Sequence, residues 1–150
     1  DVLLPGEGGL LKTAGILTEM AAERDRVRHV VVGVGINVNQ DGFPPELATL
    51  ATSVRRALGA PIDRGALLAR FLLELESAYE VFAREGCPPT VARWRPYACT
   101  GQRCRVDGGA EPFEGILEDV AGDGTLLVRR DDGRVERVIA GDVTLVRPGR

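Results

Sequence analysis

Two apolar stretches decide the fold of this chain: Leu10-Leu11-Lys12-Thr13-Ala14-Gly15-Ile16-Leu17-Thr18-Glu19-Met20 and His29-Val30-Val31-Val32-Gly33-Val34-Gly35-Ile36-Asn37-Val38-Asn39. The first is expected to form a strand over residues 10–20 and the second a strand over residues 30–39. A polar link of eight residues, Ala21 to Arg28, separates them, which predicts an antiparallel pair. The nearly continuous apolar character of both stretches predicts burial on two faces, with helices packed behind the strands.

Helical signals dominate the middle of the chain. A helix is expected from Glu46 to Leu58, because Gly59 and then Pro61 would end it. Asp63 is a good N-cap for a long helix that would end at Gly86, and a short helical piece is expected from Thr90 to Arg95. Apolar residues recur at helical spacing in the long helix and predict a core stripe. These residues are Leu67, Leu68, Phe71, Leu72, Leu75, Ala78, Tyr79 and Phe82.

Short β runs with intervening turns fill the chain beyond Thr100. They are expected near residues 103–106, 113–120, 125–130, 135–139 and 143–147. Such spacing predicts a small all-β barrel or sandwich. The expected class is therefore α+β: part of a mixed or antiparallel sheet with packed helices, followed by a small β barrel. The expected domains are residues 1–98 and 99–150.

Composition narrows the class of protein. The net charge of −3 and the pI of about 5.3 argue against nucleic-acid binding by these 150 residues, and no stretch is long and apolar enough to cross a membrane. The spacing of Cys87, Cys99 and Cys104 matches no zinc template, so we expect reduced thiols and a cytoplasmic protein. The start at Asp1 suggests the interior of a longer protein, and a targeting segment upstream is not excluded.

Lys12 and three glycines carry the chemistry of the two apolar stretches. Lys12 is the only Lys among 19 basic residues, and Lys offers a compact charge where Arg offers a planar fork. Gly15, Gly33 and Gly35 could let a flat ligand rest on bare backbone. Asn37 offers a donor and an acceptor that match an adenine edge. The alternatives are a stray Lys in an Arg-rich sequence and an Asn that closes a turn.

The segment Lys12-Thr13-Ala14-Gly15-Ile16-Leu17-Thr18-Glu19 and the segment Val31-Val32-Gly33-Val34-Gly35-Ile36-Asn37-Val38-Asn39 resemble the biotin protein ligase family. The family pattern reads Lys-x-x-Gly-Ile-Leu-x-Glu and then Gly-x-Gly-Ile-Asn-x-Asn. The resemblance covers nearly the whole chain and ends in a region similar to the family's C-terminal SH3-like domain. It implies that residues 1–98 are the C-terminal portion of the ligase catalytic domain.

The resemblance implies an ATP-dependent ligase that forms biotinyl-5′-AMP and transfers biotin to a lysine of a carboxylase carrier domain. Lys12 would be the catalytic residue, and it would bind biotin and the adenylate with Gly15, Gly33 and Gly35. Asn37 would bind adenine. The cofactors implied are biotin as substrate, ATP and Mg²⁺, and no residue is assigned as a metal ligand. The partner implied is the biotin carboxyl carrier domain. Separately, exposed strand edges could pair two copies of the chain, and the sequence does not choose between a monomer and a dimer.

Two departures from the family pattern matter. The Gly-Arg-Gly-Arg-type loop would precede Asp1, so the chain is expected to be the C-terminal part of a ligase and inactive alone. Arg147, the candidate for a phosphate-binding Arg, arrives one residue late, and a slip of one residue turns a strand side chain to the other face. The alternatives are a non-catalytic biotin- or carrier-binding module and a relative of lipoate ligases.

Overall fold

The computed structural model describes residues 1–23, 26–108, 111–139 and 141–146. The chain forms two compact units, Asp1–Phe71 and Leu72–Arg150, and each is described by itself. No helix in the described residues is long and apolar enough to cross a membrane. The domain boundary near residue 98 stays a prediction, because the division between the compact units falls inside a helix.

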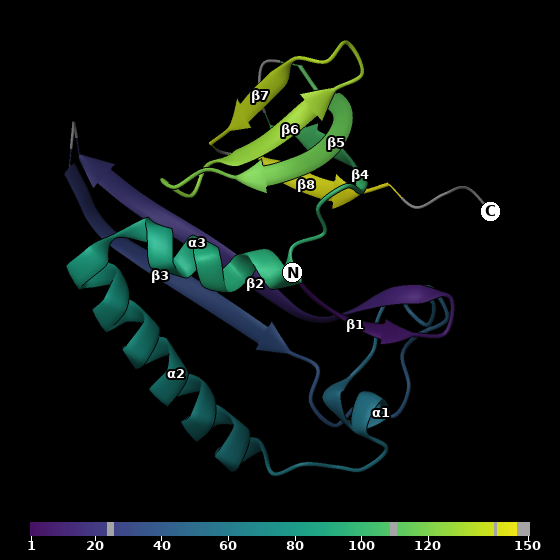
Figure 1. Cartoon of the computed structure of the whole chain (residues 1–150). Helices are drawn as coiled ribbons and strands as arrows, with labels where there is room; N and C mark the ends of the chain where they lie inside the picture. The colour runs from purple at the N-terminus through teal and green to yellow at the C-terminus, as the bar shows by residue number, and fades with distance from the viewer. Residues whose placement is uncertain (24–25, 109–110, 140, 147–150) are drawn as a thin grey trace. The chain divides into compact units, whose positions relative to one another are not determined.

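A three-stranded antiparallel sheet forms the first unit, in the order β1-β2-β3 (Figure 1). Its strands are β1 (Val2–Gly6), β2 (Gly9–Glu23) and β3 (Arg26–Ile36). The predicted antiparallel pair is confirmed, with Gly15 opposite Gly35 and Leu17 opposite Gly33. The predicted polar link was too long. Residues 21–23 and 26–28 continue the ladder, because backbone pairing does not require apolar side chains.

The expectation that helices bury both faces of these strands is wrong for the described residues. Leu17 is 65% exposed and Val31 is 53% exposed. Other large apolar side chains that stay exposed on β2 and β3 are Ile16, Met20, Val27, Val30, Val32 and Val34. Buried apolar residues of this unit gather instead where β2 meets β1 and the segment around Ala51, at Leu11, Ala14 and Ala51.

The helix predicted from Glu46 to Leu58 is wrong over most of its length. Only α1 (Val54–Leu58) is helical, and Gly59 ends it in the left-handed conformation, as predicted (φ 77°). The preceding backbone pairs with β2, since the Lys12 amide donates to the Leu50 carbonyl and the Thr52 amide donates to the Lys12 carbonyl. A short parallel bridge between Lys12 and Ala51 therefore replaces the first turns of the helix.

The long helix is confirmed as α2 (Arg64–Glu85), and the Asp63 carboxylate caps it by accepting from the Gly65 and Ala66 amides. Then come α3 (Cys87–Trp94) and a 3₁₀ turn, η1 (Arg95–Tyr97). The predicted core stripe on α2 is wrong, because no residue of the helix is buried. Helical spacing of apolar residues shows that one face could pack, but it does not supply the surface that would cover that face.

A five-stranded antiparallel sheet in the order β7-β6-β5-β4-β8 makes up most of the second unit (Figure 1). Its strands are β4 (Arg103–Asp107), β5 (Phe113–Val120), β6 (Leu126–Arg130), β7 (Val135–Val138) and β8 (Asp142–Leu145), close to the predicted runs. Cys104, Val106, Leu117 and Val128 form its buried core, with four partly buried side chains around them. The predicted α+β class with a small all-β C-terminal part is confirmed.

Candidate functional site

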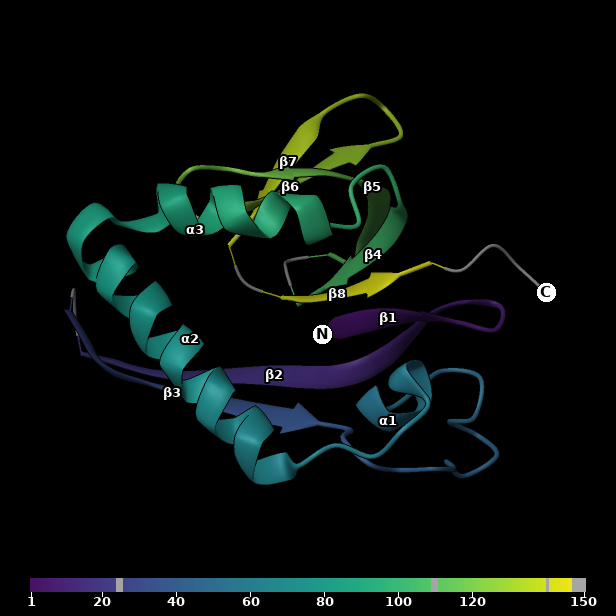
Figure 2. The ribbon, with the colours of Figure 1, turned by 60° about the horizontal axis from the view of Figure 1, so that its bottom comes forward.

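A β-bulge sets the position of Lys12. Val2 lies opposite Ala14, whereas the next residue, Leu3, lies opposite Lys12, so Thr13 is an extra residue on β2. A bulge of this kind bends the strand and re-aims the neighbouring side chain. Figures 1 and 2 show β1 running beside this part of β2. The local sequence thus places Lys12 at an irregular point of an otherwise regular ladder.

The Lys12 ammonium lies over the bare backbone of Gly15. A Cβ built on Gly15 would lie 3.3 Å from Lys12 Nζ and 3.4 Å from its Cε. The ammonium forms an ion pair with the Asp1 carboxylate, at 2.8 Å between Nζ and Oδ1, and both side chains are 49% exposed. An anion that approaches along the sheet therefore meets a compact positive charge that is accessible and already held in place.

Gly15, Gly33 and Gly35 form a strip without side chains. Gly15 on β2 lies opposite Gly35 on β3. Gly33 is two residues before Gly35 on the same strand, and side chains alternate between the faces of a strand, so the three glycines share one face. A Cβ on Gly35 would meet no atom within 4 Å, and one on Gly33 would meet only Leu17 atoms, at 3.8 and 4.0 Å. The structure thus brings Lys12 and the three glycines together, with open space over Gly35.

Asn37 lies just beyond the last pair of this ladder and is held by three hydrogen bonds. Its amide donates to the Thr13 carbonyl (2.8 Å), and its carbonyl accepts from the Val54 amide (2.9 Å). Its side-chain Nδ2 donates to the Thr52 carbonyl at 3.2 Å. The Asn37 side chain does not close a turn through neighbouring backbone. Its Oδ1 and one N–H form no hydrogen bond to the described residues, so the amide keeps one acceptor and one donor.

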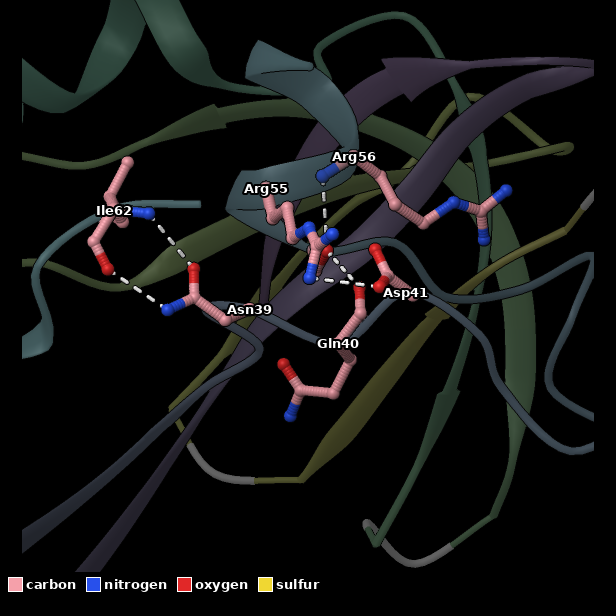
Figure 3. A network of polar contacts seen from close by, with 7 residues as sticks. Asn39, Gln40, Asp41, Arg55, Arg56 and Ile62 are labelled. Carbon is pink, nitrogen blue, oxygen red and sulfur yellow. Dashed lines mark hydrogen bonds and ion pairs between the residues drawn. The ribbon is translucent and has the colours of Figure 1, made fainter. Parts of the chain in front are cut away.

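Sequence reasoning missed the network that holds the loop after β3 (Figure 3). The Asn39 side chain forms hydrogen bonds with both the carbonyl and the amide of Ile62, at 2.9 and 3.0 Å. Ser53 is fully buried; its hydroxyl donates to the Gln40 carbonyl and accepts from the Arg56 amide as the N-cap of α1. The only signal in the sequence was a Ser placed directly before a helical run.

Thr13 adds a second feature that the sequence did not indicate. Its side chain is 4% exposed, and its Oγ1 forms no hydrogen bond to the described residues. A β-branched side chain fits a buried strand position, and its hydroxyl is the part left without a partner. Thr13 therefore serves the packing beneath the bulge rather than the exposed strip.

The other predicted site residue, Arg147, lies outside the described residues. The candidate metal chemistry has little support in the described side chains, where no group of three or more His, Cys, Asp and Glu is arranged to hold an ion. Asp1 is the carboxylate at the Lys12 position. One carboxylate suits Mg²⁺ only when substrate phosphates supply further oxygens.

The C-terminal unit has a surface depression whose charged side chains are already paired. It has a volume of about 400 Å³ and is lined by residues of β4, β5 and β6 and the turn after β6. Arg103 binds Asp131 through two hydrogen bonds and Glu114 through a third, which raises the pKa of Arg103 and lowers that of Asp131. Because both of its guanidinium groups, Arg103 and Arg130, are already paired with carboxylates, this depression is a weaker candidate than the Lys12 strip.

Comparison with known proteins finds similar chains among biotin protein ligases. A family described as "Biotin protein ligase C terminal domain" matches residues 100–146. The bifunctional ligase/repressor BirA of Bacillus spizizenii is 39% identical over 150 residues, which cover 97% of this chain and 44% of the relative. BirA of Escherichia coli is 27% identical over 135 residues, which cover 89% of this chain and 42% of the relative. The chain thus spans less than half the length of these relatives.

Solved structures show the same fold. The biotin protein ligase of Aquifex aeolicus in complex with biotin and ATP matches with a TM-score of 0.74 at 23% identity, covering 92% of this chain and 57% of that chain. The apo structure of the same ligase matches with a TM-score of 0.75. The chain therefore has the fold of the corresponding part of a ligase chain.

Proposed function

Because the chain corresponds to the C-terminal region of a biotin protein ligase, we propose that it forms part of an ATP-dependent biotin–carrier protein ligase. The proposal rests on the position of the Lys12 ammonium over Gly15, beside the strip of glycines. The side-chain amide of Asn37 forms only one hydrogen bond to the described residues, to the Thr52 carbonyl. The names of these relatives support the reaction class, and the geometry of this chain supports the roles proposed below.

The first step joins biotin to AMP. A biotin carboxylate oxygen attacks the α-phosphorus of ATP, and the bond to pyrophosphate breaks. A fixed ammonium lowers the energy of this step, since negative charge builds between the carboxylate and the phosphate. Lys12 would bind that charge in place of Asp1 or together with it, because a half-exposed ion pair is weak enough to exchange partners. Mg²⁺ would neutralise the phosphates when bound, with Asp1 as a candidate ligand.

The second step transfers biotin to a carrier domain. The uncharged amine of the carrier lysine attacks the acyl carbon of the mixed anhydride, AMP leaves, and the amine loses a proton. The acyl group is already activated, so Lys12 needs only to hold the adenylate. The open space above Gly35 leaves room for a flat ligand on the strip. The free edge of the Asn37 amide would bind adenine.

The test measures biotin-dependent exchange between pyrophosphate and ATP by the product of the complete reading frame that contains this chain. We expect Lys12→Ala to reduce exchange by roughly 10²- to 10³-fold, the usual loss on removing one group that binds transition-state charge. Lys12→Arg should not restore it, because a planar fork does not fit a site for a point charge. Arg56→Ala is the matched control, since its exposed guanidinium forms no ion pair with the described residues.

Exchange that persists within a few-fold in Lys12→Ala would overturn the proposal. The isolated 150-residue chain is the second control and is expected to be inactive. Competition between biotinyl-AMP and lipoyl-AMP separates biotin ligation from lipoate ligation. Tight binding of biotinyl-AMP without exchange would favour the non-catalytic binding module.

Partners and location belong to the same proposal. A carrier domain must bring its lysine to the Gly35 side of the strip. β3 forms one edge of the described sheet, and an edge of this length could pair with a second copy. Sedimentation of the complete protein with and without biotinyl-AMP would test for a dimer. The free cysteines agree with a cytoplasmic location, where thiols stay reduced.

A further inference from the structure

The side chains of the two asparagines that follow β3, Asn37 and Asn39, differ in how many hydrogen bonds they form to the protein. Asn39 uses both ends of its side-chain amide on one peptide: Nδ2 donates to the Ile62 carbonyl at 2.9 Å, and Oδ1 accepts from the Ile62 amide at 3.0 Å (Figure 3). Asn37 uses one N–H of its side chain, on the Thr52 carbonyl. Asn39 therefore has both its oxygen and its nitrogen engaged with backbone, whereas Oδ1 of Asn37 accepts no hydrogen bond from the described residues.

Asn39 anchors the loop that carries Asn37. The carbonyls of residues 37, 38 and 40 accept hydrogen bonds from residues 53–55, at the start of α1. Asp41 adds an ion pair to Arg55, at 2.8 Å. Asn39 reaches beyond α1, to a residue 23 positions later in the chain. The loop is thus fixed to the start of α1 by its backbone and to the far side of α1 by one side chain.

The Ile62 end of this contact is itself held. Asp63 follows directly and caps α2, with the Gly65 amide 2.7 Å from its Oδ1. A pocket of about 210 Å³ is lined by four residues of α2 and three of the β3 end, namely Arg64, Leu67, Leu68, Phe71, Val34, Ile36 and Val38. The contact between Asn39 and Ile62 therefore closes one end of the packing between β3 and the first turns of α2. A rigid anchor on one side of the loop limits how far Asn37 can move on the other.

We propose that Asn39 is a positioning residue that sets the orientation of the Asn37 amide, and through it the strength of ATP binding. The inference rests on the proposed function, because it assigns Asn37 to the adenine end of the ligase site. It divides the pair of asparagines by role: Asn37 touches the nucleotide, and Asn39 acts only through Asn37. Both amide ends of Asn39 must be paired for this, since a half-satisfied polar group would move.

A double-mutant cycle in the complete protein tests this division of roles. Asn39→Ala removes both hydrogen bonds to Ile62, and Asn39→Asp keeps only the oxygen that accepts from the Ile62 amide. We expect either change to raise the KM for ATP roughly 10-fold and to leave the KM for biotin within 2-fold, because a displaced binding group weakens only the part of the ligand that it touches. In an Asn37→Ala background, the same changes should alter the KM for ATP by less than about 2-fold.

Gln40→Ala is the matched control, since its exposed side chain forms no hydrogen bond with the described residues and its carbonyl is retained. An unchanged KM for ATP in both Asn39 variants would overturn the inference. So would an equal rise with and without Asn37, or a parallel rise in both KM values, each of which indicates a purely structural role. If Asn39→Ala does not fold, the milder Asn39→Asp completes the cycle. Absence of exchange in the unmodified protein would instead overturn the proposed function, so the two failures are distinguishable.

Discussion

The two compact units of this chain differ in where their apolar side chains lie. In the C-terminal unit, Cys104, Val106, Leu117 and Val128 close a core between strands of one small sheet. In the N-terminal unit, β2 and β3 present most of their large apolar side chains to the surface, and the buried residues gather at one end. The N-terminal unit is held mainly by the backbone hydrogen bonds of its strands and by the loop network around Asn37.

This difference separates stability from chemistry. The C-terminal sheet has a small core surrounded by Arg–carboxylate pairs, in which many of its charged side chains neutralise one another. The N-terminal strand pair keeps an accessible ammonium, a bare glycine strip and a partly free amide, which a tightly packed core would cover. The absence of side chains at Gly15, Gly33 and Gly35 leaves room for a ligand, and it also reduces the packing on this face of the sheet.

The largest effect is expected at Gly115 on β5, where the backbone of β6 packs closely against it. A Cβ on Gly115 would lie 2.6 Å from the Arg129 carbonyl oxygen and 2.8 Å from Val128 Cγ1. Gly115→Ala must therefore move backbone, and we expect a loss of about 3 kcal/mol in the free energy of unfolding. Urea unfolding followed by Trp94 fluorescence measures it. Gly122→Ala, which meets open space, should stay within about 0.5 kcal/mol, and equal losses at both sites would contradict the packing described.

A matched pair of valines compares the two units directly. Val128 is 0% exposed on β6, and Val31 is 53% exposed on β3. Val128→Thr buries a hydroxyl and should lower the free energy of unfolding by about 2 kcal/mol, whereas Val31→Thr should change it by less than about 0.5 kcal/mol. Urea unfolding of both variants measures the two changes in the free energy of unfolding. A larger loss at Val31 would show that the strand pair is covered in solution.

A smaller effect is expected at the cap of α1, which holds the loop of the N-terminal unit. Ser53→Ala removes the oxygen that accepts from the Arg56 amide and the donor to the Gln40 carbonyl. We expect a loss of about 1 kcal/mol, with faster hydrogen exchange at the Arg56 amide. Ser77→Ala, on the exposed surface of α2, is the control and should be neutral. Unchanged exchange at Arg56 would show that the loop does not depend on this cap.

The smallest effect should come from one surface ion pair of the C-terminal unit. Two hydrogen bonds from Arg95 lower the pKa of Asp119 from its ordinary value of 3.8. A lowered pKa stabilises the folded state above the ordinary value, and this contribution disappears as the pH falls through the lowered value. The difference in urea midpoint between Asp119→Asn and the unmodified chain should therefore be present at pH 7 and decrease as the pH falls from the ordinary value of 3.8 through the lowered pKa of Asp119.

Local patterns predicted the elements more reliably than their surroundings. The strands of the C-terminal sheet, the antiparallel pair of β2 and β3, the Asp63 cap and the Gly59 stop follow from turn residues, β-branched runs and caps, which act over a few neighbours. The helix predicted from Glu46 failed because the backbone of residues 50–52 found partners on β2. Nothing in that stretch reveals a bond to a residue almost 40 positions earlier.

The candidate site divides in the same way. The sequence alone determined which residues could carry the chemistry, because a single Lys, glycines within strands and an Asn at a strand end are unusual as residue types in those positions. Tertiary structure decided how they meet. A bulge at Thr13 places Lys12 over Gly15, and the register of the ladder places Gly15 opposite Gly35. Ile62 binds both ends of the Asn39 amide, whereas Asn37 keeps its side-chain oxygen without a hydrogen bond to the described residues. Residue type fixes which groups are available, whereas register and long-range hydrogen bonds fix their separation and which of them remain free to bind.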